Sequence, residues 1–269
     1  MKFNSKKAIT LLAVAGLAFA STAVHAATTA YTTGDLILGF RQTGATSSLL
    51  VNIGQAGGYR DGTTTGNLSL GNLGADLTSL FGSGWSSDAT VFWGVVGTPG
   101  SASFNSDPGN TLYATKPEGT FGVQEAAYER LSSATQGNGR SNIVSMATAY
   151  AGKTSTTNSD VALAQLNTAT NSWSSFNPGG TSFSYFSGME GNFGSGVASS
   201  ALDLFRMTPD SLAAVNFGNY EGSLTINSSG VVNFGLTTPG AVPEPGRAAL
   251  MGLGLGGFLL RRRRPAAAV

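Results

Sequence analysis

The sequence contains no cysteine, a single histidine and few charged residues, and each shortage excludes a class of protein. Without cysteine, the chain can form no disulfide and offers no thiol nucleophile. The one histidine, His25, lies near the amino terminus, so the rest of the chain lacks the usual zinc ligand sets and a Ser-His-Asp triad. We therefore expect no cofactor and no bound metal. Residues 27–242 hold 7 basic and 13 acidic side chains, and this acidic balance argues against a nucleic-acid partner.

Long apolar runs are also missing, because both apolar stretches are shorter than the roughly 20 residues that span a bilayer. The first, Ala8–Ala20, follows a basic amino terminus. Val24 and Ala26 then supply small residues at the −3 and −1 positions of a cleavage site. We predict a signal peptide over residues 1–26, cut by signal peptidase between Ala26 and Ala27. An uncleaved anchor is the alternative, and its short length disfavours it.

The second apolar stretch, Ala248–Leu260, is 13 residues long. As a helix it measures roughly 20 Å, against about 30 Å for the bilayer core, so it predicts a weak transmembrane helix over about 246–260. An extended, proline-containing motif precedes it and a basic cluster follows it. The motif is Val242, Pro243, Glu244 and Pro245, and the cluster is Arg261, Arg262, Arg263 and Arg264. The arginines act as a cytoplasmic stop, which places the rest of the chain outside.

This three-part order resembles the PEP-CTERM sorting signal of Gram-negative bacteria. The resemblance covers about 28 residues, 242–269, and only the segment after the arginines is slightly longer than the pattern needs. It implies recognition by an exosortase, which is a membrane-embedded cysteine protease-transpeptidase. It also implies removal of the tail and delivery to the cell surface, often alongside exopolysaccharide production. The implied partners are therefore an exosortase and exopolysaccharide.

The sequence divides into a signal peptide, a body over residues 27–239 and a sorting tail over residues 240–269. Apolar and β-branched runs predict most of the strands in the body. Two pairs of runs predict hairpins, Asp35–Arg41 with Ser48–Ile53 and Ser223–Asn227 with Val231–Leu236. Single strands are expected over Thr90–Val96, Thr111–Thr115 and Ala201–Met207.

Helical spacing of apolar residues predicts a helix over Leu73–Phe81, ended by Gly82. Further helices are expected over Gln124–Ser133, Ser141–Tyr150 and Val161–Leu166, with a break at residues 136–139. Strands at both ends with helices between them predict an α+β or mainly β fold. We expect an antiparallel sheet or sandwich-like body with helical insertions.

Two kinds of candidate site in the body use side-chain oxygens: a pair of catalytic carboxylates and a calcium-binding loop. A glycosidase needs only two carboxylates, which Asp76 with Asp88 or Glu125 with Glu129 could supply. Glu125 and Glu129 share a face of the predicted helix, which is more simply a solvated surface. The loop Asn105–Asn110 has oxygen ligands suited to calcium, but an Asp-Pro-Gly turn explains it without metal.

Aromatic residues offer a third kind of site, because their rings can stack on sugars. Trp85, Trp173 and Tyr185 are the candidates, and the first two lie in Ser/Gly-rich loops. Trp93 lies inside an apolar strand and is expected in the core.

Three functions remain open at the level of the sequence. The first is a non-enzymatic structural or adhesive protein of the cell surface or extracellular matrix, sorted by an exosortase. The alternatives are a carbohydrate-binding module and a polysaccharide-active enzyme. The end signals and the sparse catalytic inventory favour the first.

Overall fold

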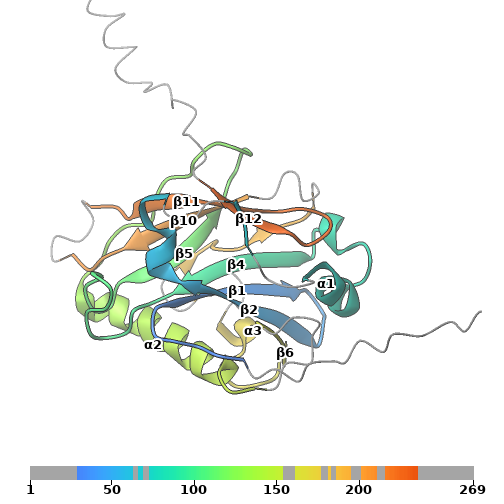
Figure 1. Cartoon of the computed structure of the whole chain (residues 1–269), viewed down its shortest axis with the longest axis horizontal. Coiled ribbons are helices and arrows are strands. Elements are labelled where there is room, and N and C mark those ends of the chain that lie inside the picture. The colour runs from blue at the N-terminus through green and yellow to red at the C-terminus, as the bar shows by residue number, and fades with distance from the viewer. Residues whose placement is uncertain are drawn as a thin grey trace, which may run out of the picture.

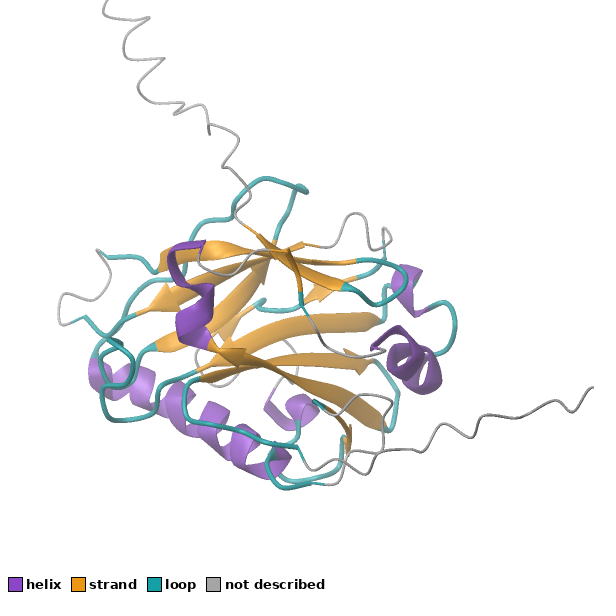
Figure 2. Cartoon of the chain, viewed as in Figure 1, coloured by secondary structure: helices purple, strands orange, loops and turns teal. Residues whose placement is uncertain are grey.

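Antiparallel β-strands make up most of the computed structural model (Figures 1 and 2). The structure describes residues 29–62, 66–68, 73–153, 161–176, 181–182, 186–194, 201–210 and 216–235. Its strands are β1 (Asp35–Gln42), β2 (Ser47–Gln55), β3 (Gly66–Asn67), β4 (Val91–Gly97), β5 (Leu112–Pro117), β6 (Ala162–Leu166), β7 (Thr181–Ser182), β8 (Phe186–Ser187), β9 (Gly191–Asn192), β10 (Ala201–Met207), β11 (Asn219–Ile226) and β12 (Val232–Gly235). Its helices are α1 (Leu73–Phe81), α2 (Ser133–Tyr150) and α3 (Trp173–Phe176), with short 3-10 turns η1 (Ala56–Gly62) and η2 (Trp85–Ser87).

The main sheet has ten strands in the order β3-β12-β11-β10-β5-β4-β1-β2-β6, with β9 paired to β4 beside this path. The strands curve into a half-barrel, with β11 and β12 at the top of Figure 1 and β6 near the bottom. Every paired neighbour is antiparallel. The structure therefore confirms a mainly antiparallel β body with few helices.

Both predicted hairpins are present. Strands β1 and β2 pair with Leu38 opposite Val51, and β11 and β12 pair with Leu224 opposite Phe234. The second hairpin turns at Gly230, whose φ of +81° suits a residue without a Cβ. Local turn chemistry and apolar patterning were therefore sufficient to predict these pairs.

The sheet carries a separate apolar core on each face, because side chains alternate along a strand. In β1, Leu36, Leu38 and Phe40 enter one core, whereas Ile37 enters the other. Helix α1 and the two 3-10 turns cover the first core, and α2 and α3 cover the second. Figure 2 shows this division, with α2 along the lower side of the sheet and α1 at its right end.

Helix α1 has the same first and last residues, Leu73 and Phe81, as the predicted helix. Its buried positions include Leu73, Leu77 and Phe81, which are spaced to face the first core. Gly82 follows with a φ of +87°, and its N–H donates to the Thr78 carbonyl at 2.9 Å. This is the glycine-terminated helix end that the sequence predicts.

The predicted break at residues 136–139 is wrong, because α2 runs unbroken over Ser133–Tyr150. Ser132 caps it by accepting from the Thr135 N–H, and Gln136, Gly139 and Ile143 are buried. Each helical glycine costs about 1 kcal/mol relative to alanine. Packing of a whole helix face on the sheet outweighs that cost.

The predicted helix over Gln124–Ser133 is also wrong, since this segment is irregular up to the start of α2. Its backbone N–H groups bond to β10 and to the segment before β11. The Glu125 N–H donates to Asp203 at 2.6 Å, and the Arg130 N–H donates to the Asn216 carbonyl at 2.9 Å. Donors committed to distant acceptors are not available for the i to i−4 bonds of a helix.

The third wrong helix is Val161–Leu166, most of which forms strand β6. It pairs antiparallel with β2, with Leu163 opposite Leu50. A helix this short is marginal by itself. The ladder with β2 satisfies the same backbone groups in an extended form.

Candidate functional site

The tryptophans proposed to stack on sugars lie in the cores. Trp85 is 2% exposed, and Trp93 and Trp173 are fully buried. The prediction for Trp93 is confirmed, whereas the expected exposure of Trp85 and Trp173 is wrong. Tyr185 lies outside the described residues.

Aromatic packing explains the burial of Trp85. Its ring meets Phe193 edge-on with centroids 5.4 Å apart, and Phe193 stacks on Trp93 at 5.8 Å. Such pairs add about 0.5–1.5 kcal/mol beyond their buried area. Trp85 thus closes the first core at η2 and presents no ring to a ligand.

Trp173 is buried on the other face, where its ring lies directly on Gly39 of β1. A Cβ at Gly39 would lie 2.2–2.5 Å from atoms of the indole ring, so only a glycine leaves room for the ring there. The indole Nε1 donates to Glu190 Oε1 at 2.7 Å, and Glu190 also forms an ion pair with Arg41 at 2.5 Å. Trp173 therefore anchors α3 to the sheet.

The predicted acid pairs do not assemble into a site. Asp76 is buried in α1, whereas Asp88 caps a turn by accepting from the N–H and hydroxyl of Thr90, each at 2.7 Å. These bonds hold the pKa of the Asp88 carboxyl below its usual value. Glu125 and Glu129 share no helix face, because no helix forms there.

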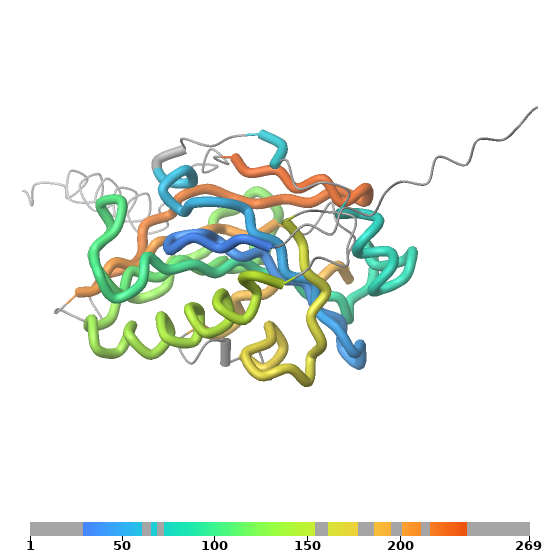
Figure 3. Tube along the Cα trace, turned by 60° about the horizontal axis from the view of Figure 1, so that its bottom comes forward, coloured from blue at the N-terminus to red at the C-terminus, as the bar shows by residue number. Residues whose placement is uncertain are grey.

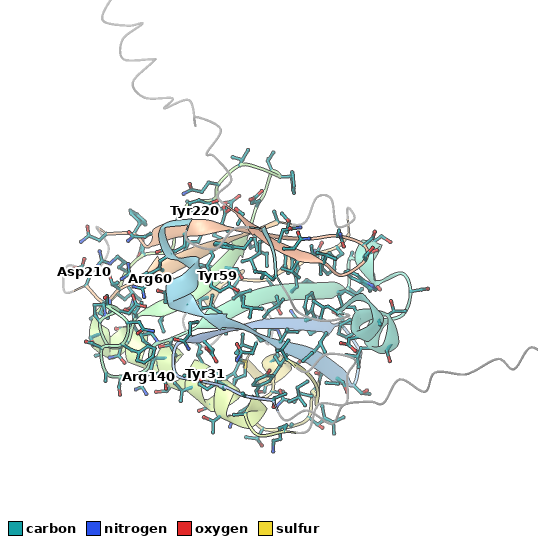
Figure 4. All side chains as sticks on the ribbon, in the orientation of Figure 1. Tyr31, Tyr59, Arg60, Arg140, Asp210 and Tyr220 are labelled. Carbon is teal, nitrogen blue, oxygen red and sulfur yellow. The ribbon has the colours of Figure 1, made fainter. Side chains whose placement is uncertain are left out.

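The loop Asn105–Asn110 turns its carboxylate toward arginines. Asp107 is buried, and its oxygens accept from Arg206 Nε at 2.6 Å and from the Tyr113 hydroxyl at 2.7 Å. Arg60 on η1, labelled in Figure 4, adds an ion pair at 3.4 Å. The carboxylate of Asp107, which the calcium hypothesis assigned to a metal ion, is bound by two guanidinium groups. The loop is therefore better explained as a turn.

A buried carboxyl pair, Glu118 with Asp203, is the candidate site that the structure adds. The Ser223 hydroxyl joins them, with its oxygen 2.6 Å from Asp203 Oδ1 and 3.1 Å from Glu118 Oε1. The hydroxyl of Tyr220 lies 2.9 Å from the same oxygen. Asp203 is fully buried and Glu118 is 8% exposed.

The pKa of Asp203 is raised to about 6, mainly by burial and also by the charge and hydrogen bond of Glu118, although the hydrogen bonds from Ser223 and the Glu125 N–H lower it. A carboxyl with a raised pKa is one half of a glycosidase pair. The two carboxyls accept from backbone N–H groups of the segment after β5, Glu118 from Gly122 and Asp203 from Glu125, and through Ser223 they connect this segment to β10 and β11. This geometry supports a structural clamp on that segment, because neither carboxyl is open to a substrate.

Asp203→Asn should therefore stabilise the fold in a pH-dependent way. Between pH 4 and pH 6 the folded protein binds a proton at Asp203 that the unfolded chain, with a pKa of 3.8, releases. The wild type thus loses stability as the pH rises through this window, whereas the amide does not titrate. The variant should match the wild type near pH 4 and exceed it at pH 7, by up to about 3 kcal/mol. Thermal or urea unfolding across this range measures the difference.

Asp88→Asn is the matched control, because it should lower the stability of the folded state at neutral pH, where Asp203→Asn should raise it. Its folded pKa is lowered, so the carboxylate stabilises the fold above its unfolded pKa, and that contribution is lost in the amide. A difference between Asp203→Asn and wild type that stays constant with pH would show that Asp203 is not a buried titrating group.

Sequence reasoning missed the carboxyl pair because its members lie on separate strands and loops. The one local signal is an aspartate at the centre of the apolar run of β10, Ala201–Met207, where alternation with Leu202 and Leu204 places it on the opposite face. A charged residue at such a position is rarely buried without partners.

The signal peptide and the sorting tail, including Ala26, Ala27, Val242–Pro245 and Arg261–Arg264, lie outside the described residues. Within the described ranges, no helix combines the length and apolar character needed to cross a bilayer. The same ranges contain no cluster of three or more acidic or histidine side chains placed to share a metal ion.

Comparison with known proteins gives no relative for this chain. No protein family, no curated protein and no solved structure matches it. Function must therefore be argued from the chain itself.

Proposed function

We propose that this chain is an exported, exosortase-sorted protein of the cell surface or extracellular matrix, with a structural or adhesive role beside exopolysaccharide. The observation that carries the proposal is the order of Val242–Pro245, the apolar stretch Ala248–Leu260 and Arg261–Arg264. In this view signal peptidase removes residues 1–26, and the short span holds the body at the membrane until an exosortase cuts the tail.

The end of the described body supports a separate tail. The last described strand, β12, ends at Gly235, which is seven residues before Val242 in the sequence. Seven residues reach at most about 25 Å when extended. The motif would therefore lie between the body and the membrane, where a membrane-embedded protease can bind it.

The described body supports a structural role over the two carbohydrate-directed alternatives. The tryptophans that a binding module would use are buried in the cores. The carboxyl pair that an enzyme would use is buried and is engaged by Ser223 and by the N–H groups of Gly122 and Glu125. These contacts join parts of the half-barrel that are distant in the sequence.

Replacing Pro243, Glu244 and Pro245 with alanines tests the sorting role. The alanines allow the helix to extend upstream and remove the extended segment that a protease would bind. The variant should stay in the membrane fraction of the native host with its tail attached, as seen by fractionation and immunoblotting of the body. Alanines at Thr237, Thr238 and Pro239 are the matched control and should leave trimming unchanged. Trimming and release of the motif variant at the wild-type level would refute the sorting role.

Replacing Arg261–Arg264 with neutral residues should have a different effect on the location of the protein. Each central arginine costs about 2.5–3.5 kcal/mol to move into the bilayer, so the four arginines hold the tail on the cytoplasmic side. Without them the tail should pass through the membrane and leave untrimmed protein in the soluble fraction. If this variant instead behaves like the alanine variant, the arginines do not act as a stop.

A further inference from the structure

Strand β6 forms one end of the main sheet and has a neighbour on one side only among the described strands. The Asn52 N–H donates to the Val161 carbonyl at 3.0 Å, and the Asn167 N–H donates to the Thr46 carbonyl at 2.8 Å. Because bonding groups alternate along an antiparallel strand, the odd-numbered residues of β6 face β2. The N–H and C=O of Ala164 therefore point away from the sheet.

A hollow of about 320 Å³ runs along this edge. Four consecutive strand residues, Leu163–Leu166, line it, so it follows the edge of the strand and not a single face. Ala149 of α2, Lys153 just after α2 and Ala169 after β6 complete its lining. Figure 3 shows the end of α2 beside the yellow segment that contains β6.

The dimensions of the hollow suit one extended strand. The four strand residues that line the hollow span about 13 Å, so an extended peptide of similar length can lie beside them. Small side chains at Ala149, Ala164 and Ala169 leave this space open.

The residues of β6 lack two of the devices that protect a sheet edge, a charged side chain and a proline. The sequence of this strand, ALAQL, contains no charge and no proline, and Leu166 is 60% exposed. Gln165 is 9% exposed, and its Oε1 has no hydrogen-bond partner within the described part of the chain. Leu166 therefore gives the edge apolar surface, and the N–H and C=O of Ala164 give it hydrogen-bonding groups that point outward, whereas Gln165 Oε1 is buried.

Lys153 is the one charged residue in the lining, and it indicates the direction of the occupant. The Tyr150 hydroxyl donates to the Val161 carbonyl at 2.6 Å, which places the end of α2 at the start of β6. An added strand running antiparallel to β6, as every pair in this sheet does, would end beside Lys153. A carboxylate at that end would complement its charge.

We propose that β6 is a docking edge for an extended peptide of a partner protein, with small apolar side chains and a carboxylate at its carboxyl end. The peptide continues the sheet as an antiparallel strand, exchanges two hydrogen bonds with Ala164 and places its carboxylate at Lys153. This proposal stands independently of the sorting role, because it uses only residues of the described body.

The test uses the full chain in mild detergent and a fluorescent hexapeptide of alternating valine and alanine. One form of the peptide ends in a free carboxylate and the other in an amide, and anisotropy at low salt measures binding. The carboxylate peptide should bind saturably and several-fold more tightly than the amide. Ala164→Pro removes the edge N–H and should weaken binding by about tenfold or more, whereas Ala164→Ser keeps that donor and should bind as the wild type does.

Lys153→Gln should reduce the affinity for the carboxylate peptide to that for the amide, and Lys153→Arg should restore it. If circular dichroism shows that Ala164→Pro is unfolded, Ala149→Phe replaces it, because a larger side chain there fills the hollow. No saturable binding to the wild type, or unchanged binding to a folded edge variant, would overturn the proposal. Self-association of the wild type that Ala164→Pro abolishes would assign the edge to a second copy of the chain and would equally overturn it.

Discussion

Gly39→Ala is expected to destabilise the folded state by about 3 kcal/mol or more, although it adds a single methyl group. A Cβ at this position would lie 2.2–2.5 Å from ring atoms of Trp173, well inside van der Waals contact. Trp173 is fully buried and cannot swing into solvent without opening the second core. Its displacement would also break the bond from Nε1 to Glu190. The loss should appear as a fall in Tm of about 6–12 °C.

Gly137→Ala is the matched control, since it makes the same chemical change in α2. A Cβ there meets no atom closer than Asn110 Oδ1 at 4.0 Å, so the variant should gain up to about 1 kcal/mol from helix propensity. In a Trp173→Phe background, Gly39→Ala should cost less than it does alone, because the smaller ring leaves room for the methyl group. If Gly39→Ala destabilises the fold equally in both backgrounds, then Trp173 is not the residue that excludes a side chain at Gly39.

Asp107→Ala should cost about 3–5 kcal/mol, because it leaves two arginines without their shared carboxylate. The side chains of Arg60 and Arg206 are only 13% and 18% exposed, so water replaces the lost partner poorly. Glu221 is buried and also acts on Arg206, so it offsets part of the positive charge that remains. Urea unfolding at pH 7 measures the loss.

Tyr113→Phe is the comparison variant for this network. It removes the hydrogen bond of 2.7 Å to Asp107 and keeps all of the charges, so it should cost about 1 kcal/mol. Equal losses for Tyr113→Phe and Asp107→Ala would mean that the hydrogen bond, and not the charge of Asp107, stabilises this end of the sheet.

The sequence pattern within a short window correctly predicted those helices and strands whose structure depends on neighbouring residues. Helix α1 has its apolar residues at helical spacing and a glycine at its end, and the two hairpins have matching runs around short turns. In these segments the sequence periodicity and the tertiary environment favour the same structure. Their prediction required no knowledge of distant contacts.

Distant contacts decide the segments that were predicted wrongly. Helix α2 crosses two glycines because the sheet buries one face of it, and β6 is extended because β2 provides its hydrogen bonds. The segment before α2 is irregular because acceptors such as Asp203 bind its N–H groups. Nothing within a short window of sequence encodes these partners.

The candidate sites also differ in whether they depend on neighbouring residues or on distant contacts. The sequence marked Trp173 as a loop residue, but its position depends on Gly39, which lies in a strand far from it in the chain. Glu118 and Asp203 meet only after β5 and β10 pair, so the carboxyl pair could not be predicted from spacing. In contrast, the sorting tail is a contiguous motif, and its interpretation depends on the sequence alone.

Mass spectrometry of both termini of the protein released by its native host tests the central claim most directly. Export and sorting predict a chain that begins at Ala27 and lacks the apolar stretch and the arginine cluster, residues 248–264. A released protein that begins at Met1, or one that still carries Arg261–Arg264, would contradict it.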